Sequence, residues 1–321
     1  MRIVLIGPTG HIGGYLVPRL VEAGHEVVAI SRGQQRLYRD DPAWASVERV
    51  TADRVAEDAA GVFGKRIADL EPDAVIDLVC FTAESAEQLL GALAGSGVPL
   101  LECGSIWVHG VLHAVPARET DPREPWGDYG LGKLAIERLV LAATERGDVR
   151  GAVLHPGHIS GPGWPVINPA GNLDPAVWER LAAGERTVLP GSGTETLHHV
   201  HADDVAQAFQ LALERIDAAA GRAFHVVSER ALTLRGYAEA VAGWFGGEPH
   251  LEFVPLDEFA RTTSPEHAEA SAEHLRHSPA ASIEAAREAL GYAPRFTSLE
   301  AAREAVEALA AAGRVRLPAF A

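Results

Sequence analysis

The chain has 321 residues, 47% hydrophobic and 22% charged, with 28 basic against 44 acidic side chains and a net charge of −16. This length predicts one large domain or two modest ones, each with a packed core. No apolar run reaches the ~20 residues of a membrane span, and the acidic surface disfavours nucleic acid and anionic membranes as partners. The chain begins in a strand-like segment without a signal-peptide pattern, and its two cysteines, Cys80 and Cys103, cannot make a disulfide framework. We therefore expect a cytoplasmic protein.

The first half of the chain alternates apolar runs with amphipathic helical patterns. The runs are apolar throughout, which is typical of strands buried on both faces. Strands that alternate with helices predict an α/β fold with a parallel, doubly wound sheet of the Rossmann type. The expected strands are residues 3–6, 27–30, 47–50, 74–79, 98–101 and 152–154, and the expected helices are 11–23, 64–70, 83–93 and 128–144.

The second half is less regular. Residues 155–171 are rich in proline and glycine, which predicts a shaped loop. We expect helices at 174–183, 203–215, 234–245, 283–290 and 299–311, a loop at 189–195, and a last strand at 224–227. This pattern predicts one body made of residues 1–155, to which 200–228 return. It also predicts a smaller, mostly helical lobe made of 156–199 and 229–321.

A glycine-rich turn joins the first strand to the first helix. At the first strand–helix junction of a doubly wound sheet, such a turn places backbone N–H groups and the positive end of a helix against a dinucleotide pyrophosphate. The larger body is therefore predicted to be a dinucleotide-binding domain. The residues expected to bind the cofactor here are Gly7, Thr9, Gly10, His11, Ile12 and Gly13.

The residues after the second and third strands bear on the choice of cofactor. An acidic residue after strand two would bind the ribose hydroxyls of NAD, but this strand ends in Ser31 and Arg32. A guanidinium suits the 2′-phosphate of NADP, so NADP is favoured while NAD stays open. Asp53, just after strand three, is expected to accept a hydrogen bond from the adenine amino group.

Three polar residues in the middle of the chain are candidates for catalysis. Tyr129 and Lys133 lie four residues apart on one face of a predicted helix. An ammonium next to a phenol favours the phenolate, which can exchange a proton with a secondary alcohol. Ser105 follows the fifth strand, at the edge of the sheet where ligands bind, and could hold the substrate oxygen.

At this point the sequence resembles the extended short-chain dehydrogenase/reductase superfamily, in its NAD-dependent epimerase/dehydratase branch. The matching segments are the glycine turn, residues 105–110, the Tyr129–Lys133 pair, and residues 155–162, 201–206 and 290–294. The resemblance implies a catalytic triad of Ser105, Tyr129 and Lys133, a substrate-binding lobe and, as is common in that family, a homodimer. It also places Val79, Lys133 and His155 at the cofactor, and Ser105, Trp107, His158 and His199 at the substrate.

The departures from the family pattern concern the substrate. Ile106 and Trp107 stand where dehydratases of this branch carry an Asp-Glu pair, which disfavours dehydration. His158 replaces the loop Asn, and Leu197 replaces an Arg that often grips a nucleotide diphosphate. We therefore predict hydride transfer at a secondary alcohol or ketone of a small molecule, such as a sugar, a polyol or a natural-product intermediate.

Two other functions remain open from the residues alone. Histidines cluster at 155–158 and 198–201 near Asp203 and Asp204, which is compatible with a metal-dependent hydrolase or lyase. The spacing is not that of an established zinc motif, so no metal is expected. A non-catalytic dinucleotide sensor or an RNA-associated scaffold is the third possibility, against which the complete triad and the negative charge argue.

Overall fold

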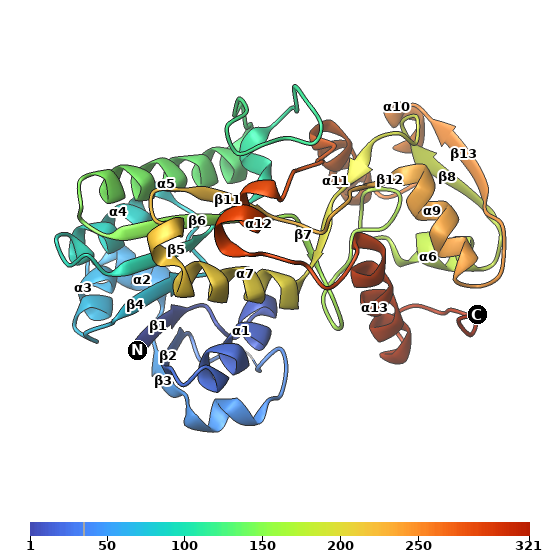
Figure 1. Cartoon of the computed structure of the whole chain (residues 1–321). Coiled ribbons are helices and arrows are strands. Elements are labelled where there is room, and N and C mark those ends of the chain that lie inside the picture. Colours follow the sequence, from blue (N-terminus) through green and yellow to red (C-terminus); the bar gives the residue numbers. More distant parts are fainter. Residues whose placement is uncertain (35) are drawn as a thin grey trace.

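The computed structural model describes residues 1–34 and 36–321. A central sheet of seven parallel strands has the order β11-β6-β5-β4-β1-β2-β3 (Figure 1). Its strands are β1 (Arg2–Ile6), β2 (Glu26–Ser31), β3 (Glu48–Thr51), β4 (Ala74–Asp77), β5 (Pro99–Cys103), β6 (Arg150–Pro156) and β11 (Ala223–Val226). The predicted doubly wound α/β fold is confirmed.

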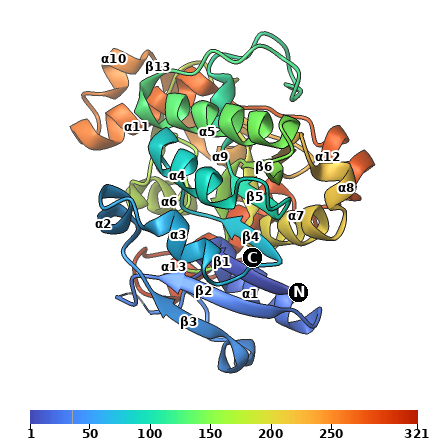
Figure 2. The same ribbon diagram turned by 90° about the vertical axis from the view of Figure 1, so that its left-hand side faces the viewer.

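Helices cover both faces of this sheet (Figure 2). Alternate residues of β1 explain why: Ile3 and Leu5 belong to one apolar core, and Val4 and Ile6 to the other. The first core is shared with α1 (His11–Glu22), α7 (Ala202–Glu214) and α12 (Glu284–Leu290). The second is shared with α3 (Phe63–Ala68), α4 (Ala83–Leu93) and α5 (Gly127–Glu145). Four short helices also belong to this body: η1 (Pro42–Ser46), α2 (Arg54–Ala59), η2 (Ile106–His109) and α8 (Ile216–Ala219).

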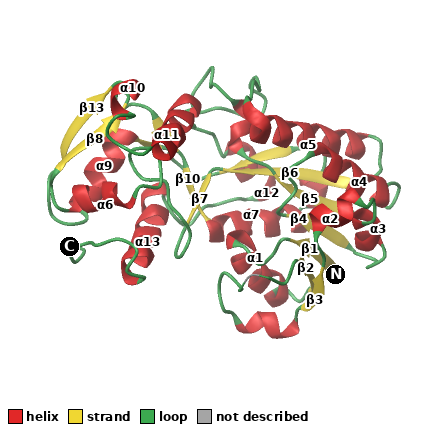
Figure 3. Cartoon of the chain, turned by 180° about the vertical axis from the view of Figure 1, so that it is seen from behind, coloured by secondary structure: helices red, strands yellow, loops and turns green. Residues whose placement is uncertain are grey.

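A smaller lobe lies beyond the carboxyl ends of the strands (Figure 3). It contains helices α6 (Pro175–Ala182), α9 (Leu234–Gly243), α10 (Leu256–Phe259), α11 (Pro265–His277) and α13 (Ser298–Ala311). Three strand pairs support them: β7 (His158–Ser160) with β10 (His199–His201), β9 (Thr196–Leu197) with β12 (Leu232–Thr233), and β8 (Arg186–Pro190) with β13 (His250–Val254). The core of this lobe is built around Trp178 and Tyr237, both fully buried.

Some of these elements differ from the expectation. β7 lies in a segment expected to be a loop, β8 overlaps the start of another, and β9 and β10 lie where no element was expected. Strands of two to five residues carry too few side chains to show a period. α11 was not anticipated, since Leu275 is its only large aliphatic residue. α12 lies within residues assigned to the lobe, yet it packs in the core of the sheet. In the described part of the chain, every helix is too short or too polar to span a bilayer.

Candidate active site

Two adjoining cavities, which we together call the cleft, lie at the carboxyl ends of the central strands, where ligands bind to open α/β sheets. Its outer part, about 420 Å³, extends from the glycine turn to the ends of β2 and β3. Its inner part, about 310 Å³, extends from the same turn to the start of α5. The two parts share the residues Gly7, Gly10, Val79, Phe81 and Trp164.

The glycine turn between β1 and α1 has the shape that a pyrophosphate requires. Gly7 has φ +78°, and a Cβ on Gly13 would lie 2.0 Å from the carbonyl oxygen of Pro8. A Cβ on Gly10 would meet no atom nearer than 4.0 Å, so the space in front of the turn is open. Gly10 caps α1 without a side-chain hydrogen bond, which leaves the first N–H groups of the helix available to an anion. The residues present therefore fit a bound dinucleotide.

Of the remaining predicted turn residues, Thr9 lines the outer cleft, and His11 and Ile12 line the inner one. The imidazole of His11 is buried, and burial lowers its pKa to about 3, so this ring is neutral. It stacks on Trp164, with ring centroids 4.9 Å apart and an angle of 17° between the planes. Trp164 comes from the Pro/Gly-rich loop after β7 and borders both parts of the cleft, a role that no local pattern in the sequence indicated.

The outer cleft brings together the residues expected to select the cofactor. Ser31, Arg32 and Asp53 all line it. Asp53 also caps α2, where its Oδ1 accepts a hydrogen bond from the N–H of Ala56 at 3.2 Å. Arg54, which the sequence reasoning missed, lines the same space and forms an ion pair with the buried Asp77, with 2.5 Å between Nη1 and Oδ2.

Beneath the cleft, Asp77 lies beside Glu102, its register partner on β5. Ligand atoms of Asp77, Cys80 and Glu102 lie within 4.8 Å of one another, the one such three-residue group in the described chain. Burial raises the pKa of Glu102 well above its usual value, and the neighbouring Asp77 raises it further. Arg54 already balances the charge of Asp77, so Glu102 is expected to be protonated.

The inner cleft brings the three predicted catalytic residues together. Ser105, Tyr129 and Lys133 all line it, beside Gly7 and Gly10 of the turn. Tyr129 lies in the first turn of α5 and is 45% exposed, whereas Lys133 is 2% exposed. Ser105 lies two residues after the end of β5, and its Oγ accepts a hydrogen bond from the N–H of Trp107 at 3.3 Å.

The position of Lys133 differs from the expected pairing with the phenol. Its Nζ donates to the carbonyl oxygens of Cys80 and Cys103, both at 2.7 Å, and lies 5.9 Å from the ring centroid of Tyr129. The ammonium thus ties the end of β5 to the segment after β4. The ammonium contributes positive charge to the inner cleft, which Lys133 lines, and makes no direct hydrogen bond to Tyr129.

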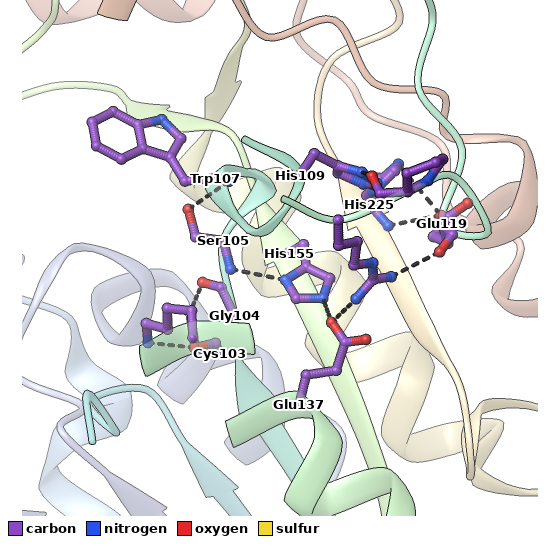
Figure 4. A network of polar contacts seen from close by, with 12 residues as sticks. Cys103, Gly104, Ser105, Trp107, His109, Glu119, Glu137, His155 and His225 are labelled. Carbon is purple, nitrogen blue, oxygen red and sulfur yellow. Dashed lines mark hydrogen bonds and ion pairs between the residues drawn. The ribbon is translucent and has the colours of Figure 1, made fainter. Parts of the chain in front are cut away.

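His155, expected at the cofactor, does not line the cleft. Its ring is fully buried behind Ser105, where Nδ1 accepts the Ser105 N–H at 2.9 Å and Nε2 lies 2.6 Å from Oε2 of Glu137 (Figure 4). The imidazole therefore contacts the backbone of a predicted catalytic residue. The other two residues expected here do line the cleft: Val79 borders both parts and Lys133 the inner part.

Of the residues expected at the substrate, Ser105 lines the inner cleft, whereas Trp107, His158 and His199 line neither part of the cleft. The indole of Trp107 meets the Tyr129 ring edge-on at 5.9 Å and stacks on His277 of α11 at 4.0 Å. His158 and His199 are neighbours on β7 and β10, with ring centroids 5.6 Å apart, and neither lines the described cleft. In the described part of the chain, the histidine clusters bring no three ligand atoms within 4.8 Å of one another.

Comparison with known proteins agrees with this geometry. Residues 3–226 match the model of the NAD dependent epimerase/dehydratase family. The chain belongs to this family. It is thus an enzyme of the extended short-chain dehydrogenase/reductase type, whose members include proteins named reductase, dehydrogenase and epimerase.

Two curated relatives illustrate the range of this family. A 2′-dehydrokanamycin reductase from Streptomyces kanamyceticus is 30% identical over 80% of this chain and 70% of its own length. A dTDP-6-deoxy-L-talose 4-dehydrogenase (NAD(P)(+)) from Kitasatospora kifunensis is 28% identical over 94% of both chains. Among solved structures, a UDP-glucuronic acid 4-epimerase from Bacillus cereus in complex with NAD has a TM-score of 0.73 at 16% identity, covering 97% of this chain and 99% of its own. That last likeness concerns the fold.

Proposed function

We propose that this family member is an NAD(P)-dependent oxidoreductase or epimerase acting on a secondary alcohol or ketone of a sugar, polyol or natural-product intermediate. The observation that carries the proposal is the inner cleft, where Ser105, Tyr129 and Lys133 line one space with the glycine turn. A dinucleotide on that turn would extend along the cleft towards Tyr129. Dehydration is not proposed, because Ile106 and Trp107 follow Ser105 and supply no acid or base.

In this reaction, a bound nicotinamide dinucleotide supplies the hydride acceptor or donor. Tyr129 is the general acid/base, whose phenol exchanges a proton with the substrate oxygen. Ser105 donates a hydrogen bond to the same oxygen. Lys133, held by the carbonyl groups of Cys80 and Cys103, adds positive charge that favours the ionised phenol.

The lining of the inner cleft supports an uncharged reacting group. Apart from Lys133, the described side chains that line it carry no formal charge, and Phe81, Ile159 and Trp164 make much of its wall. No described arginine lines this part, so the inner cleft provides no guanidinium clamp for a diphosphate. An alcohol or ketone carbon on a ring fits such a wall.

We propose NADP(H) as the preferred cofactor because Arg32 and Ser31 line the outer cleft where an adenosine 2′-phosphate would lie, with NAD(H) as the alternative. Gly7, Thr9, Gly10, His11, Ile12 and Gly13 would hold the pyrophosphate region, and Asp53 the adenine. We further propose a cytoplasmic location, supported by the two free, buried thiols, and a homodimer, which sedimentation velocity would test.

The first test is to identify the bound cofactor and the net reaction. Cofactor released from purified protein is identified by its absorbance and mass, and sugars, polyols and their ketones are then screened by the change in absorbance of the nicotinamide. Tightly retained cofactor with turnover but no net absorbance change indicates an epimerase, whereas a steady change indicates a net reductase or dehydrogenase. Absence of dinucleotide binding contradicts the proposal.

The second test removes the proposed acid/base. Tyr129→Phe keeps the ring and deletes the hydroxyl, so turnover is expected to fall by about 10²–10⁴-fold while cofactor affinity stays within about twofold. Tyr15→Phe, on α1 and outside the cleft lining, is the matched control. A Tyr129→Phe enzyme with near wild-type turnover would refute the assigned role.

A further inference from the structure

The short 3-10 helix η2 (Ile106–His109) begins directly after Ser105 and is held at both ends by buried histidines (Figure 4). At its start, the N–H of Ser105 donates to Nδ1 of His155 at 2.9 Å. At its end, Nε2 of His109 lies 2.8 Å from Nε2 of His225. All four residues are buried. The segment that carries Ser105 is thus fixed by two imidazoles from β6 and β11.

The tautomer of His155 follows from its two contacts. Because Nδ1 accepts the Ser105 N–H, the proton of the neutral ring lies on Nε2, which donates to Oε2 of Glu137 at 2.6 Å. Burial lowers the pKa of His155, which keeps the ring neutral. Burial alone would raise the pKa of Glu137, but the hydrogen bond from His155 and the charge of Arg123 lower it to about 2. Glu137 therefore stays ionised and keeps the proton of His155 on Nε2, so that Nδ1 remains an acceptor for the Ser105 N–H.

Arg123 connects the two ends of this arrangement. Its guanidinium forms an ion pair with Glu137, and Nη2 donates to the carbonyl oxygen of Glu119 at 2.8 Å. The carboxylate of Glu119 in turn accepts the backbone N–H of His225 at 2.8 Å. The polar contacts form a chain that joins the two ends of η2, which we call the η2 clamp: Ser105, His155, Glu137, Arg123, Glu119, His225 and His109.

We propose that His155 and Glu137 are positioning residues that hold Ser105 in its working orientation. The inference rests on the proposed catalytic role of Ser105. The Ser105 hydroxyl also caps η2 through the N–H of Trp107, so its direction depends on how the backbone at residue 105 is held. Loss of the acceptor on His155 leaves a buried N–H unpaired, and the segment must shift to regain a partner. A displacement of about 1 Å in a reacting group can cost on the order of 10²-fold in rate.

His198 offers a matched control, because it makes the same kind of contacts away from the cleft. It is also fully buried, its Nδ1 accepts the N–H of Ala281 at 3.1 Å, and its Nε2 donates to the carbonyl oxygen of Ser228 at 2.8 Å. A substitution at His198 removes an equivalent buried imidazole without touching the η2 clamp. Comparing substitutions at His155 and His198 therefore distinguishes a loss of Ser105 positioning from a general loss of stability.

The test compares His155→Leu, His155→Asn and His198→Leu with the wild type. Leu removes the acceptor at similar volume, whereas the side-chain oxygen of Asn lies near the place of Nδ1 and can still accept the Ser105 N–H. Hydrogen exchange of the amides in residues 103–110, measured with bound NADPH, is expected to be about tenfold faster in His155→Leu, as for one lost hydrogen bond. His155→Asn and His198→Leu are expected to exchange there at the wild-type rate.

Turnover of the alcohol or ketone found in the screen gives the second readout. In His155→Leu, kcat is expected to fall on the order of 10²-fold with KM within about threefold, and His155→Asn is expected to recover most of kcat. Wild-type exchange or wild-type kcat in His155→Leu overturns the proposal, as does an equal loss of kcat in His198→Leu. If no wild-type turnover is found, the proposed function fails, while the exchange data still decide whether His155 holds Ser105. Glu137→Gln, which keeps the size of the side chain, is expected to show the same two effects more weakly.

Discussion

Buried neutral histidines should make this protein sensitive to mild acid, and His198 allows the effect to be measured at one site. Burial is the main cause that lowers the pKa of His198 to about 4, from about 6.5 in the unfolded chain. A group with a lowered pKa in the folded state adds stability above pH 6.5, and this stability is lost as the pH falls through 4. Protonation would place a second N–H on Nδ1, opposite the N–H of Ala281 that it now accepts.

The magnitude follows from the distance between the working pH and the unfolded pKa. At pH 5, 1.5 pH units below 6.5, the unfolded ring is protonated and the folded ring is mostly neutral, which corresponds to about 2 kcal/mol at ~1.4 kcal/mol per unit. Asp204 has the opposite effect on stability, because burial raises its pKa to about 6 and its contribution to stability grows as the pH falls. The total change in unfolding free energy between the two pH values therefore does not isolate His198. The informative quantity is the difference between the wild type and His198→Gln.

The assay is urea unfolding followed by tryptophan fluorescence at pH 7.5 and pH 5. His198→Gln is expected to be less stable at pH 7.5, because the Ala281 N–H loses its acceptor. Between the two pH values it should lose about 2 kcal/mol less than the wild type does. His250→Gln, at an exposed position at the start of β13, should lose as much as the wild type. An equal loss in the wild type and in His198→Gln would refute the reasoning that this imidazole is buried and neutral.

Three further predictions concern the cleft. Arg32→Glu should weaken NADP(H) binding by at least about tenfold in titration calorimetry and leave NAD(H) binding unchanged. Unchanged NADP(H) affinity would remove the argument for a 2′-phosphate site. Gly13→Ala should abolish dinucleotide binding, since its Cβ would lie 2.0 Å from a backbone oxygen, whereas Gly91→Ala, with open space around it, should bind normally. Trp164→Ala should raise the cofactor dissociation rate about tenfold in stopped-flow fluorescence, as for one lost aromatic contact, and an unchanged rate would show that Trp164 does not cover the cofactor.

The sheet and the glycine turn could be predicted because both depend on local sequence. Strands buried on both faces require apolar residues at every position, so β1, β2 and β4 are visible as runs without a partner being known. The turn is local in two respects: Gly7 has a positive φ, and a Cβ on Gly13 would meet Pro8 of the same turn. The side chain of Val79, which a Cβ on Gly7 would meet, comes from the segment after β4. Tyr129 and Lys133 were singled out by their spacing on one helix, and both line the inner cleft.

The sequence did not indicate which groups these side chains contact. The helical spacing of Tyr129 and Lys133 suggested direct contact between them. Instead, Nζ of Lys133 donates to two backbone carbonyl groups, one at the end of β5 and one in the segment after β4. Carbonyl acceptors are present at every residue, so no sequence pattern marks which of them a buried lysine will meet. His155 likewise matched a motif position, but the sequence did not indicate that its Nε2 would contact Glu137 from α5.

The sequence by itself therefore determined the layers of the fold, the glycine turn and the identity of the residues that line the cleft from the first βα unit and α5. These features arise from hydrophobic periodicity and backbone sterics, which act over a few residues. Only the tertiary structure decided that Trp164 borders both parts of the cleft, that α12 packs with the sheet, and that His155 accepts the backbone N–H of Ser105. The hydrogen bond from the backbone N–H of Ser105 to the imidazole of His155, for example, joins residues 50 positions apart. Their partners are chosen by the packing of whole elements, because a buried polar group binds whichever partner the assembled fold brings within reach.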